Sequence, residues 1–342
     1  MTKLDTMFPL SFSYSSLSSF WSCELKGFRA SIQHLRPPND NPDLLAGGAF
    51  AKACELARKG YYNEGLSQEE AIEIGKAYIL ASPDTGHAIK TNERVAYSFE
   101  KYIEVFPFNQ ECKPCVLEDG SHAIEYKFEI DTGIPHPDFP DRNILFTGIS
   151  DGLYGLYEVS SKKRIETYII DEKTTSRIYR LPGAKVVDLE KEANVFRASS
   201  QLIGYCVVAE MLGIKVDAAL IRRIPILKTY EPAYELEIPI TQFMKDRWAI
   251  STFSKIESLK QKYLLYKENK GTYPQQFFYP TYGNSCNAYA RPCPYIEGCL
   301  TKDGEQLLST IYEQKVSKVN ENGERESVPL AEFKKLLKSG KE

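Results

Sequence analysis

Two runs rich in Ile, Tyr, Val and Thr lie within residues 144–176 and are separated by the polar residues 160–163. Runs of β-branched and aromatic residues divided by a short polar turn predict a β-hairpin. The second run passes through the apolar residues 168–170 and then reaches Asp171, Glu172 and Lys173. Because side chains alternate between the faces of a strand, Asp171 and Lys173 are expected on one face and Glu172 on the other.

Periodic segments on both sides of this hairpin predict an α/β chain. Serines and apolar residues at helical spacing predict a first helix over 12–30, with Cys23 inside it. Ser67 and Glu70 form a capping-box signature for another helix. The remaining expected helices cover residues 47–55, 71–82, 91–106, 199–213 and 241–267, and the remaining strands cover 123–130, 217–226 and 234–240.

Composition limits the class of protein. Of the 342 residues, 42% are hydrophobic and 26% are charged, which is ordinary for a soluble globular protein. The formal charge of −3 provides no overall basic field, so a nucleic-acid site would have to be a local groove. No run approaches the roughly 20 apolar residues of a membrane span, and the N-terminus lacks the apolar core of a signal peptide. Eight cysteines without an export signal indicate a reducing cytoplasm and metal-bound or free thiols.

The hairpin carries the strongest candidate chemistry. Asp151 on the first strand, with Asp171 and Lys173 on the second, would place two carboxylates and an ammonium group together. Carboxylate oxygens are the ligands that Mg²⁺ takes, usually only one or two of them, with waters and substrate phosphate completing the shell. Two simpler alternatives stay open: Asp171 and Lys173 could form an ion pair at a strand end, and Asp151-Gly152 could be only a turn.

The order and spacing of three motifs resemble the PD-(D/E)XK nuclease superfamily. The motifs are residues 148–152, residues 169–175 and the pair Gln201 and Tyr205. The chain is most similar to the RecB-like branch, which includes RecB and AddB nuclease domains, CRISPR-associated exonucleases and their phage relatives, and the resemblance runs from Ser13 to Leu300. It implies a restriction-endonuclease-like fold, with a mixed central sheet flanked by helices.

The resemblance also implies an activity. That activity is Mg²⁺- or Mn²⁺-dependent hydrolysis of DNA phosphodiesters, as an exonuclease in recombination, repair or phage DNA processing. The substrate is expected to be single-stranded DNA or DNA with free ends, in the cytoplasm of a bacterial or phage-infected cell. Recombination or replication proteins are possible partners, and no membrane partner is expected.

The resemblance implies roles for specific residues. Asp151 and Asp171 would hold the cation together with the backbone carbonyl of Glu172. Lys173 would orient or activate the attacking water, whereas Gln201 and Tyr205 would position the substrate strand. One departure concerns the first motif, in which the family's metal-binding His is replaced by Ala51 when the glycines are aligned. Glu55, one helical turn later, is an alternative ligand. The simpler interpretation is that Glu55 is an exposed residue on the helix.

Three cysteines near the C-terminus form a second candidate site. Cys286, Cys293 and Cys299 occupy 14 residues with C-x6-C-x5-C spacing, which favours metal binding over core packing. RecB-like nucleases with an iron-sulfur cluster take a fourth Cys from upstream of the first motif, and Cys23 holds that place here. Four thiolates suit a [4Fe-4S] cluster or a structural Zn²⁺. The C-x-x-C at 112–115 has no second pair nearby, so an incidental loop pair is expected there.

The expected organisation is a nuclease domain over 1–302, with a helical insertion at 60–110 and a Cys-rich loop at 284–300. A polar and helical tail is expected over 303–342. Two further classes of function remain open from the sequence. One is a catalytically inactive, cluster-stapled DNA-binding or scaffolding module, which Ala51 favours. The other is a zinc protein that binds another protein.

Overall fold

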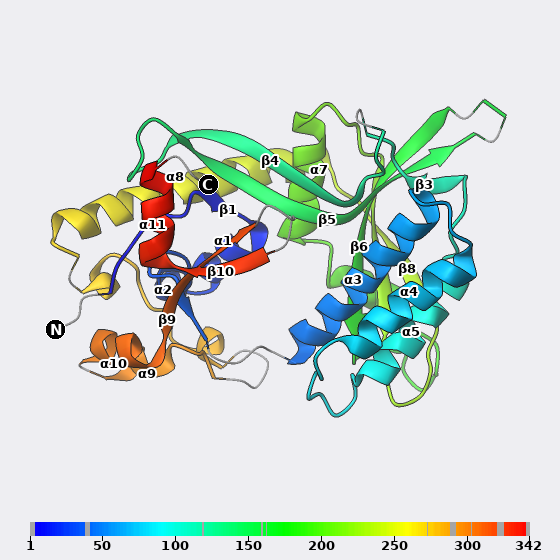
Figure 1. Cartoon of the computed structure of the whole chain (residues 1–342), viewed down its shortest axis with the longest axis horizontal. Helices are drawn as coiled ribbons and strands as arrows, with labels where there is room; N and C mark the ends of the chain where they lie inside the picture. The colour runs from blue at the N-terminus through cyan, green and yellow to red at the C-terminus, as the bar shows by residue number, and fades with distance from the viewer. Residues whose placement is uncertain are drawn as a thin grey trace. The chain divides into compact units, whose positions relative to one another are not determined.

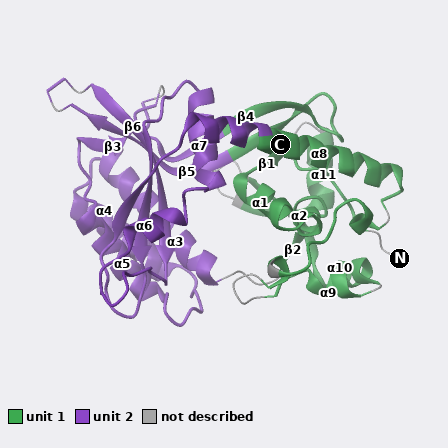
Figure 2. Cartoon of the chain, turned by 180° about the vertical axis from the view of Figure 1, so that it is seen from behind, with its two compact units in different colours: residues 1–39, 129–147, 251–342 green, residues 40–128, 148–250 purple. Residues whose placement is uncertain are grey.

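The computed structural model describes residues 4–37, 42–117, 120–158, 160–161, 163–271, 273–287, 292–301, 303–319 and 325–339 (Figure 1). The chain divides into two compact units, each assembled from several segments (Figure 2). Unit 1 contains residues 1–39, 129–147 and 251–342, and unit 2 contains residues 40–128 and 148–250. The segment expected to be one domain, 1–302, therefore contributes to both units.

The expected mixed central sheet, flanked by helices, is present. Its main strands are β4 (Ile124–Pro135), β5 (Asn143–Tyr157), β6 (Arg164–Thr175), β7 (Ala218–Pro225) and β8 (Tyr234–Ile238). The predicted hairpin is formed by β5 and β6, which pair antiparallel with Gly152 opposite Ile170. The β6–β7 pairing is parallel, and β8 adds antiparallel to β7. Strand β4 continues five residues past the end expected at 130.

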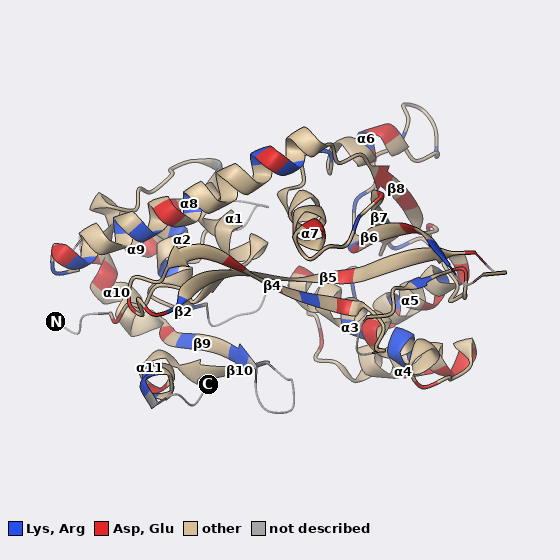
Figure 3. Ribbon diagram, turned by 90° about the horizontal axis from the view of Figure 1, so that it is seen from above, with Lys and Arg blue, Asp and Glu red and all other residues tan. Residues whose placement is uncertain are grey.

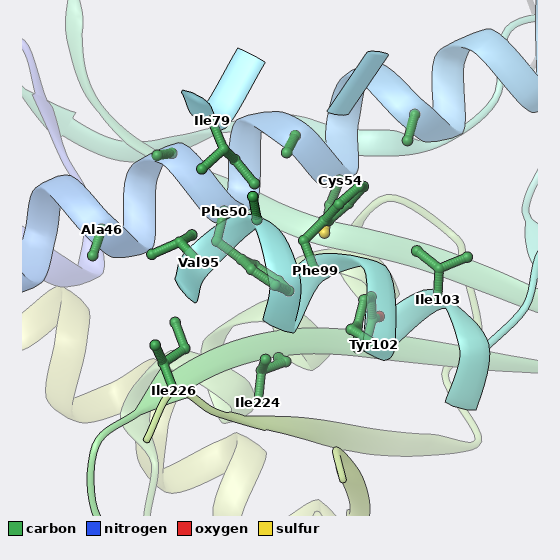
Figure 4. Close-up of a cluster of buried hydrophobic side chains, with 14 of the residues drawn as sticks. Ala46, Phe50, Cys54, Ile79, Val95, Phe99, Tyr102, Ile103, Ile224 and Ile226 are labelled. Atoms are coloured by element: carbon green, nitrogen blue, oxygen red, sulfur yellow. The ribbon is translucent and has the colours of Figure 1, made fainter. Parts of the chain in front are cut away.

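In unit 2, three helices cover one face of this sheet: α3 (Pro42–Tyr62), α4 (Gln68–Ala81) and α5 (Asn92–Val105). Figure 4 shows Phe50 and Phe99, from α3 and α5, packed over Ile224 and Ile226 at the end of β7. Small buried residues along α3 let the neighbouring helices approach closely. The helix α4 begins at the predicted capping box, in which Ser67 and Glu70 exchange hydrogen bonds.

The other face of the sheet in unit 2 is covered by α7 (Ser200–Met211), while the short helix α6 (Leu189–Asn194) lies in the β6–α7 connection. Ser199 caps the start of α7, and the backbone enters the left-handed region just after its end, at Gly213 with φ 78°, as the sequence predicted. Gly204 lies in the middle of α7, where a Cβ atom would approach Trp248 to 2.5 Å. Close packing between α7 and Trp248 therefore requires glycine at this position.

Gly204→Ala should lower the free energy of unfolding by about 1–3 kcal/mol, because the added methyl overpacks the contact with Trp248. Denaturant unfolding measures this change. Gly48→Ala is the matched control, since Gly48 also lies inside a helix of unit 2 but has open space at its Cβ position. The control should be neutral or stabilising by up to about 1 kcal/mol. Equal stability changes in the two variants would contradict the packing role of Gly204.

In unit 1, the structure of the N-terminal segment differs from the prediction. The segment expected as one helix over 12–30 forms two, α1 (Tyr14–Ser22) and α2 (Glu24–Ser31), with Cys23 between them in extended backbone at φ −163° and ψ 115°. The break lets α2 fold back onto α1. A Cβ atom on Gly27 would lie 2.4 Å from the Phe20 ring, so the two helices meet at a glycine.

The remaining elements of unit 1 include a small antiparallel sheet of β2 (Leu35–Arg36), β9 (Glu313–Val319) and β10 (Arg325–Pro329). The segment after 302 was expected to be a helical tail. It contains α10 (Gly304–Ile311) and α11 (Leu330–Ser339) together with the strands β9 and β10. Short elements complete the chain: β1 (Ser11–Phe12), β3 (Cys112–Pro114), η1 (Pro274–Gln276), η2 (Asn284–Cys286) and α9 (Ile296–Leu300).

The longest helix, α8 (Gln242–Glu268), matches the helix expected over 241–267 within one residue at each end. Both acidic and basic residues lie along it (Figure 3). Among the residues that the structure describes, no helix is both long and apolar enough to cross a membrane.

Candidate active site

Asp151 and Asp171 meet where the ladder between β5 and β6 begins. Gly152 and Ile170 are paired, so the two aspartates occupy the next position on each strand. The Oδ2 atom of Asp151 accepts a hydrogen bond from the backbone N–H of Glu172 at 2.6 Å. The Lys173 ammonium lies 2.8 Å from Oδ1 and 2.7 Å from Oδ2 of Asp171. The structure thus brings together three of the predicted residues, which we call the Asp–Asp–Lys group (Asp151, Asp171 and Lys173).

Electrostatics disfavour two negative charges in this group. Burial raises the pKa of Asp151 well above its usual range, the charge of Asp171 raises it further, and Lys173 opposes both effects. Burial also raises the pKa of Asp171, again with Lys173 in opposition. One ammonium group therefore does not compensate two buried carboxylates, and a second positive charge would stabilise both in their ionised form.

The side chain of Glu172 points to the opposite face of β6, as the alternation predicted. It accepts hydrogen bonds from the Arg58 guanidinium on α3 and from the Tyr102 hydroxyl on α5. Both side chains of the Arg58–Glu172 ion pair are 2% exposed. Burial raises the pKa of Glu172, but Arg58 and the hydrogen bonds outweigh burial and lower it overall. This ion pair fixes the strand segment whose carbonyl was predicted to be a ligand.

Ala51 lies on the part of α3 that passes β6. A Cβ atom on Gly47 would be 3.6 Å from Thr174 Oγ1, and Arg58 pairs with Glu172, so α3 follows β6 on both sides of Ala51. Glu55 is engaged within its own helix, because its carboxylate pairs with Lys52 at 2.9 Å and Lys59 at 2.6 Å. The alternative ligand Glu55 is therefore held by two lysines.

Glu125, at the start of β4, is a residue that the sequence reasoning missed. Its backbone is left-handed, with φ 49°, and its side chain is partly buried. Burial, followed by the charge of Glu55, raises its pKa to about 7, and Glu172 contributes in the same direction. Glu125 also raises the pKa of Asp151. In the sequence, Glu125 was one charged position in an alternating strand, and no local signal placed it near the aspartates.

Glu125 should make stability fall as the pH rises. Its pKa is raised from 4.5 to about 7 on folding, so its contribution is complete below pH 4.5 and is lost as the pH passes through 7. In metal-free buffer, Glu125→Gln should match the wild type near pH 4.5 and exceed its free energy of unfolding by up to about 3 kcal/mol near pH 7.5. Urea unfolding across this range provides the measurement. Glu237→Gln, at an exposed strand position, is the control, and parallel pH profiles for wild type and Glu125→Gln would contradict the prediction.

Gln201 and Tyr205 lie together on α7 and connect this helix to β5. The Gln201 amide donates to the Tyr205 hydroxyl at 2.8 Å, and that hydroxyl donates to the Ile149 carbonyl at 2.6 Å. The Tyr205 ring also packs edge-on against Phe128, with ring centroids 5.6 Å apart. Both side chains were predicted to position the substrate strand. In the structure, the buried Tyr205 positions the protein strand that leads into Asp151.

The four predicted cysteines line one cavity of about 200 Å³ in unit 1, which we call the thiol cavity. Cys23 lies at the α1–α2 break, and its sulfur accepts a hydrogen bond from the Thr281 N–H at 3.4 Å. The Cys299 sulfur accepts from the Arg29 guanidinium at 2.9 Å, and the Cys293 N–H donates to the Cys286 carbonyl at 2.7 Å. Burial raises the pKa of the thiols of Cys293 and Cys299.

Within the described part of the chain, no group of three or more His, Cys, Asp or Glu side chains is arranged to hold a metal ion. The thiols share a cavity but do not form a closed site, and the Asp–Asp–Lys group contains only two carboxylates. Cys112 lies in β3 and Cys115 directly follows this strand, and both are free thiols. The sequence predicted that this C-x-x-C pair has no metal or redox role.

Comparisons with known proteins do not name a family. No protein-family model matches the chain, and no curated protein matches it. Among solved structures, a similar chain is that of "Crystal structure of SSO0001", at 12% sequence identity and a TM-score of 0.24. The match covers 63% of this chain and 87% of that chain. A likeness at this TM-score assigns neither fold nor function.

Proposed function

We propose that the chain is a metal-dependent deoxyribonuclease of the RecB-like PD-(D/E)XK class, with a restriction-endonuclease-like fold, acting as an exonuclease. The observation that carries the proposal is the Asp–Asp–Lys group at the start of the β5–β6 ladder. The Asp151 carboxylate on β5 accepts a hydrogen bond from the Glu172 N–H on β6, 21 positions away in the chain, and Lys173 pairs with Asp171 on β6. The motifs at 148–152 and 169–175 supply the resemblance.

A divalent cation fits the residues that are present. Mg²⁺ commonly takes one or two carboxylates and completes its shell with waters and substrate phosphate, so a site with two aspartates is sufficient. Burial raises the pKa values of Asp151 and Asp171, and the charge of Asp171 raises that of Asp151 further, so a bound cation would stabilise the ionised form of both carboxyls. Asp151, Asp171 and the carbonyl of Glu172 would hold the cation. When bound, Mg²⁺ or Mn²⁺ lowers the pKa of a water and stabilises charge on the scissile phosphate.

The protein residues then have distinct tasks. Lys173 neutralises Asp171, and because its side chain is 34% exposed, its ammonium group can also donate a hydrogen bond to a water or phosphate oxygen. Arg58 and Tyr102 hold Glu172 from the opposite face of β6, so its backbone carbonyl keeps a fixed direction. Tyr205 holds the strand before Asp151 through the Ile149 carbonyl. Such positioning, together with local charge, is the main requirement of in-line phosphoryl displacement.

The thiol cavity supports the proposal of a [4Fe-4S] cluster or a structural Zn²⁺. Four thiols line it, and the Arg29 guanidinium donates to the Cys299 sulfur, which partly offsets the rise in the pKa of this thiol that burial causes. The residues fit such a group by donor chemistry: four soft sulfur ligands suit tetrahedral zinc or an iron-sulfur cluster. The cysteines would then join the N-terminal helices to η2 and α9 within unit 1.

Cys293→Ser should release the bound metal and lower thermal stability, because metal-binding energy is also folding energy at such a site. Metal analysis of protein purified without oxygen, visible absorbance and thermal melting give the readouts. Iron with broad absorbance indicates a cluster, and about one zinc without colour indicates a zinc site. Cys112→Ser is the matched control, since Cys112 is a free thiol outside the thiol cavity. A Cys293→Ser variant that melts like wild type would contradict the proposed metal site.

A second candidate function is a catalytically inactive DNA-binding or scaffolding module. Ala51, at the position where the resembled family has a metal-binding His, is the specific observation that favours it. Metal-dependent release of nucleotides from DNA separates the two candidates, because an inactive module would bind DNA without cleaving it.

A further inference from the structure

Unit 2 contains a second cavity, of about 180 Å³, on the face of β6 that carries the Glu172 side chain. We call it the aromatic cavity. Its principal lining residues are Arg58, Tyr62, Phe106, Phe108, Tyr154 and Arg222. None of the motifs that define the proposed active site lies among them, so the aromatic cavity needs a separate explanation.

The walls of the aromatic cavity are flat π surfaces and guanidinium groups. The Arg222 guanidinium lies 4.4 Å from the centroid of the Phe106 ring and 5.7 Å from that of Tyr154. Arg58 lies 5.6 Å from the same Tyr154 centroid. On another side, the rings of Tyr62 and Phe108 are 5.8 Å apart. Aromatic rings and guanidinium planes are the surfaces on which proteins stack unpaired nucleobases.

The charges of both arginines are already compensated. Arg58 pairs with Glu172, and Arg222 Nε donates to Glu235 at 2.9 Å. With two cations beside two carboxylates, the cavity provides no net positive charge for a phosphate. A neutral ring system therefore fits the cavity better than an anion does.

Hydrogen-bond donors nevertheless remain unused. Arg58 Nε is buried without a hydrogen-bond partner, in a side chain that is 2% exposed. Arg222 uses Nε and Nη1, the latter to the Tyr102 hydroxyl at 3.2 Å, and its Nη2 has no hydrogen bond to the described residues. A buried donor without an acceptor is unfavourable, so an occupant that presents acceptors would be stabilised here.

We infer that the aromatic cavity binds the base of a nucleotide, with an acceptor edge toward the two arginines. Guanine is the best match, because its O6 and N7 atoms are two neighbouring acceptors, one for the unused donor of each arginine. The cavity volume of about 180 Å³ is below the roughly 300–1,000 Å³ of pockets for drug-sized molecules. The cavity is therefore of a size for one ring system. Binding of the base is independent of the cleavage chemistry. Only the source of the base, a substrate strand or a released nucleotide, rests on the proposed nuclease function.

The position of the aromatic cavity gives it a connection to the active site. Arg58 lines the cavity and holds Glu172, whose backbone N–H donates to Asp151. A base that engages Arg58 would therefore contact the group that fixes the β6 segment of the Asp–Asp–Lys group.

Isothermal titration of the full chain in EDTA tests this inference with guanosine monophosphate, guanosine, adenosine monophosphate and inorganic phosphate. We expect guanosine monophosphate and guanosine to bind, and adenosine monophosphate to bind about 5- to 100-fold more weakly. A single-stranded oligonucleotide with one unpaired guanine, titrated in parallel, distinguishes a strand from a free nucleotide. Since EDTA removes divalent cations, failure of the nuclease proposal would leave these results unaffected.

Phe106→Ala should weaken guanosine binding about 5-fold or more by removing one stacking face. Phe106→Leu retains apolar volume but lacks the ring, so it should weaken binding as well. It provides the test if the Ala variant does not fold. Phe243→Ala is the matched control, an exposed aromatic of unit 2 outside the cavity, and should bind like wild type. The inference fails if no nucleoside binds, if phosphate binds as tightly as guanosine monophosphate while guanosine does not bind, or if the two Phe106 variants bind like wild type.

Discussion

Lys173→Ala is expected to reduce DNA cleavage by about 100- to 10,000-fold, the usual contribution of a positioned group that orients or activates a reactant. The variant loses the only ammonium group that the structure places on Asp171 among its described residues. Folding should be compared with Mn²⁺ present, because Asp171 is 1% exposed and loses its counter-ion in the variant unless a bound cation compensates its charge. Cleavage rates with Mn²⁺, together with DNA binding and melting curves, provide the measurements.

Lys215→Ala is the matched control for this substitution. Lys215 also pairs with an aspartate two residues away, Asp217 at 2.6 Å, but its side chain is 84% exposed and lies outside the Asp–Asp–Lys group. Its removal should leave cleavage unchanged, since exposed ion pairs contribute at most about 1 kcal/mol to stability. Full activity in Lys173→Ala would place the active site elsewhere in the chain.

The second large effect is on stability. Arg58→Ala should lower the free energy of unfolding by about 3–5 kcal/mol, because it leaves the Glu172 carboxylate buried without its counter-ion. Both side chains are 2% exposed, so water cannot replace the lost partner without rearrangement. Urea unfolding measures the change, and Lys52→Ala, which removes a partly exposed partner of Glu55, should cost less than about 1 kcal/mol.

A double variant separates the lost charge from the lost packing. Arg58→Met combined with Glu172→Gln keeps much of the side-chain volume and leaves no unpaired buried charge. It should recover part of the stability that Arg58→Ala loses. If Arg58→Ala unfolds at the same urea concentration as Lys52→Ala, the buried ion pair does not support β6 as described.

Local signals in the sequence predicted much of the fold. The capping box at Ser67 and Glu70 and the stop after α7 at Gly213 depend on neighbouring residues only, and both were found where expected. The hairpin of β5 and β6 was predicted because its two runs are adjacent in the chain. Alternation within β6 also predicted that Asp171 and Glu172 face opposite sides, as their separate partners demonstrate.

Contacts between distant residues could not be predicted in this way. Arg58 and Glu172 are 114 positions apart, and neither belongs to a local pattern that names the other. The left-handed backbone of Glu125 has no sequence signal, because glutamate, unlike glycine or asparagine, rarely adopts it. The break at Cys23 was also missed, since neither Gly nor Pro occurs at that position and the contact between Phe20 and Gly27 that accompanies the break joins two separate helices.

The most direct test of the central claim is a nuclease assay on end-labelled single-stranded and double-stranded DNA, with Mg²⁺, Mn²⁺ or EDTA. Wild-type protein should release nucleotides with either metal and none in EDTA. Asp171→Asn, which keeps the shape of the side chain but removes its charge, should be inactive and should no longer bind Mn²⁺. A wild-type chain that leaves both substrates intact with both metals, or an Asp171→Asn variant as active as wild type, would contradict the proposed active site.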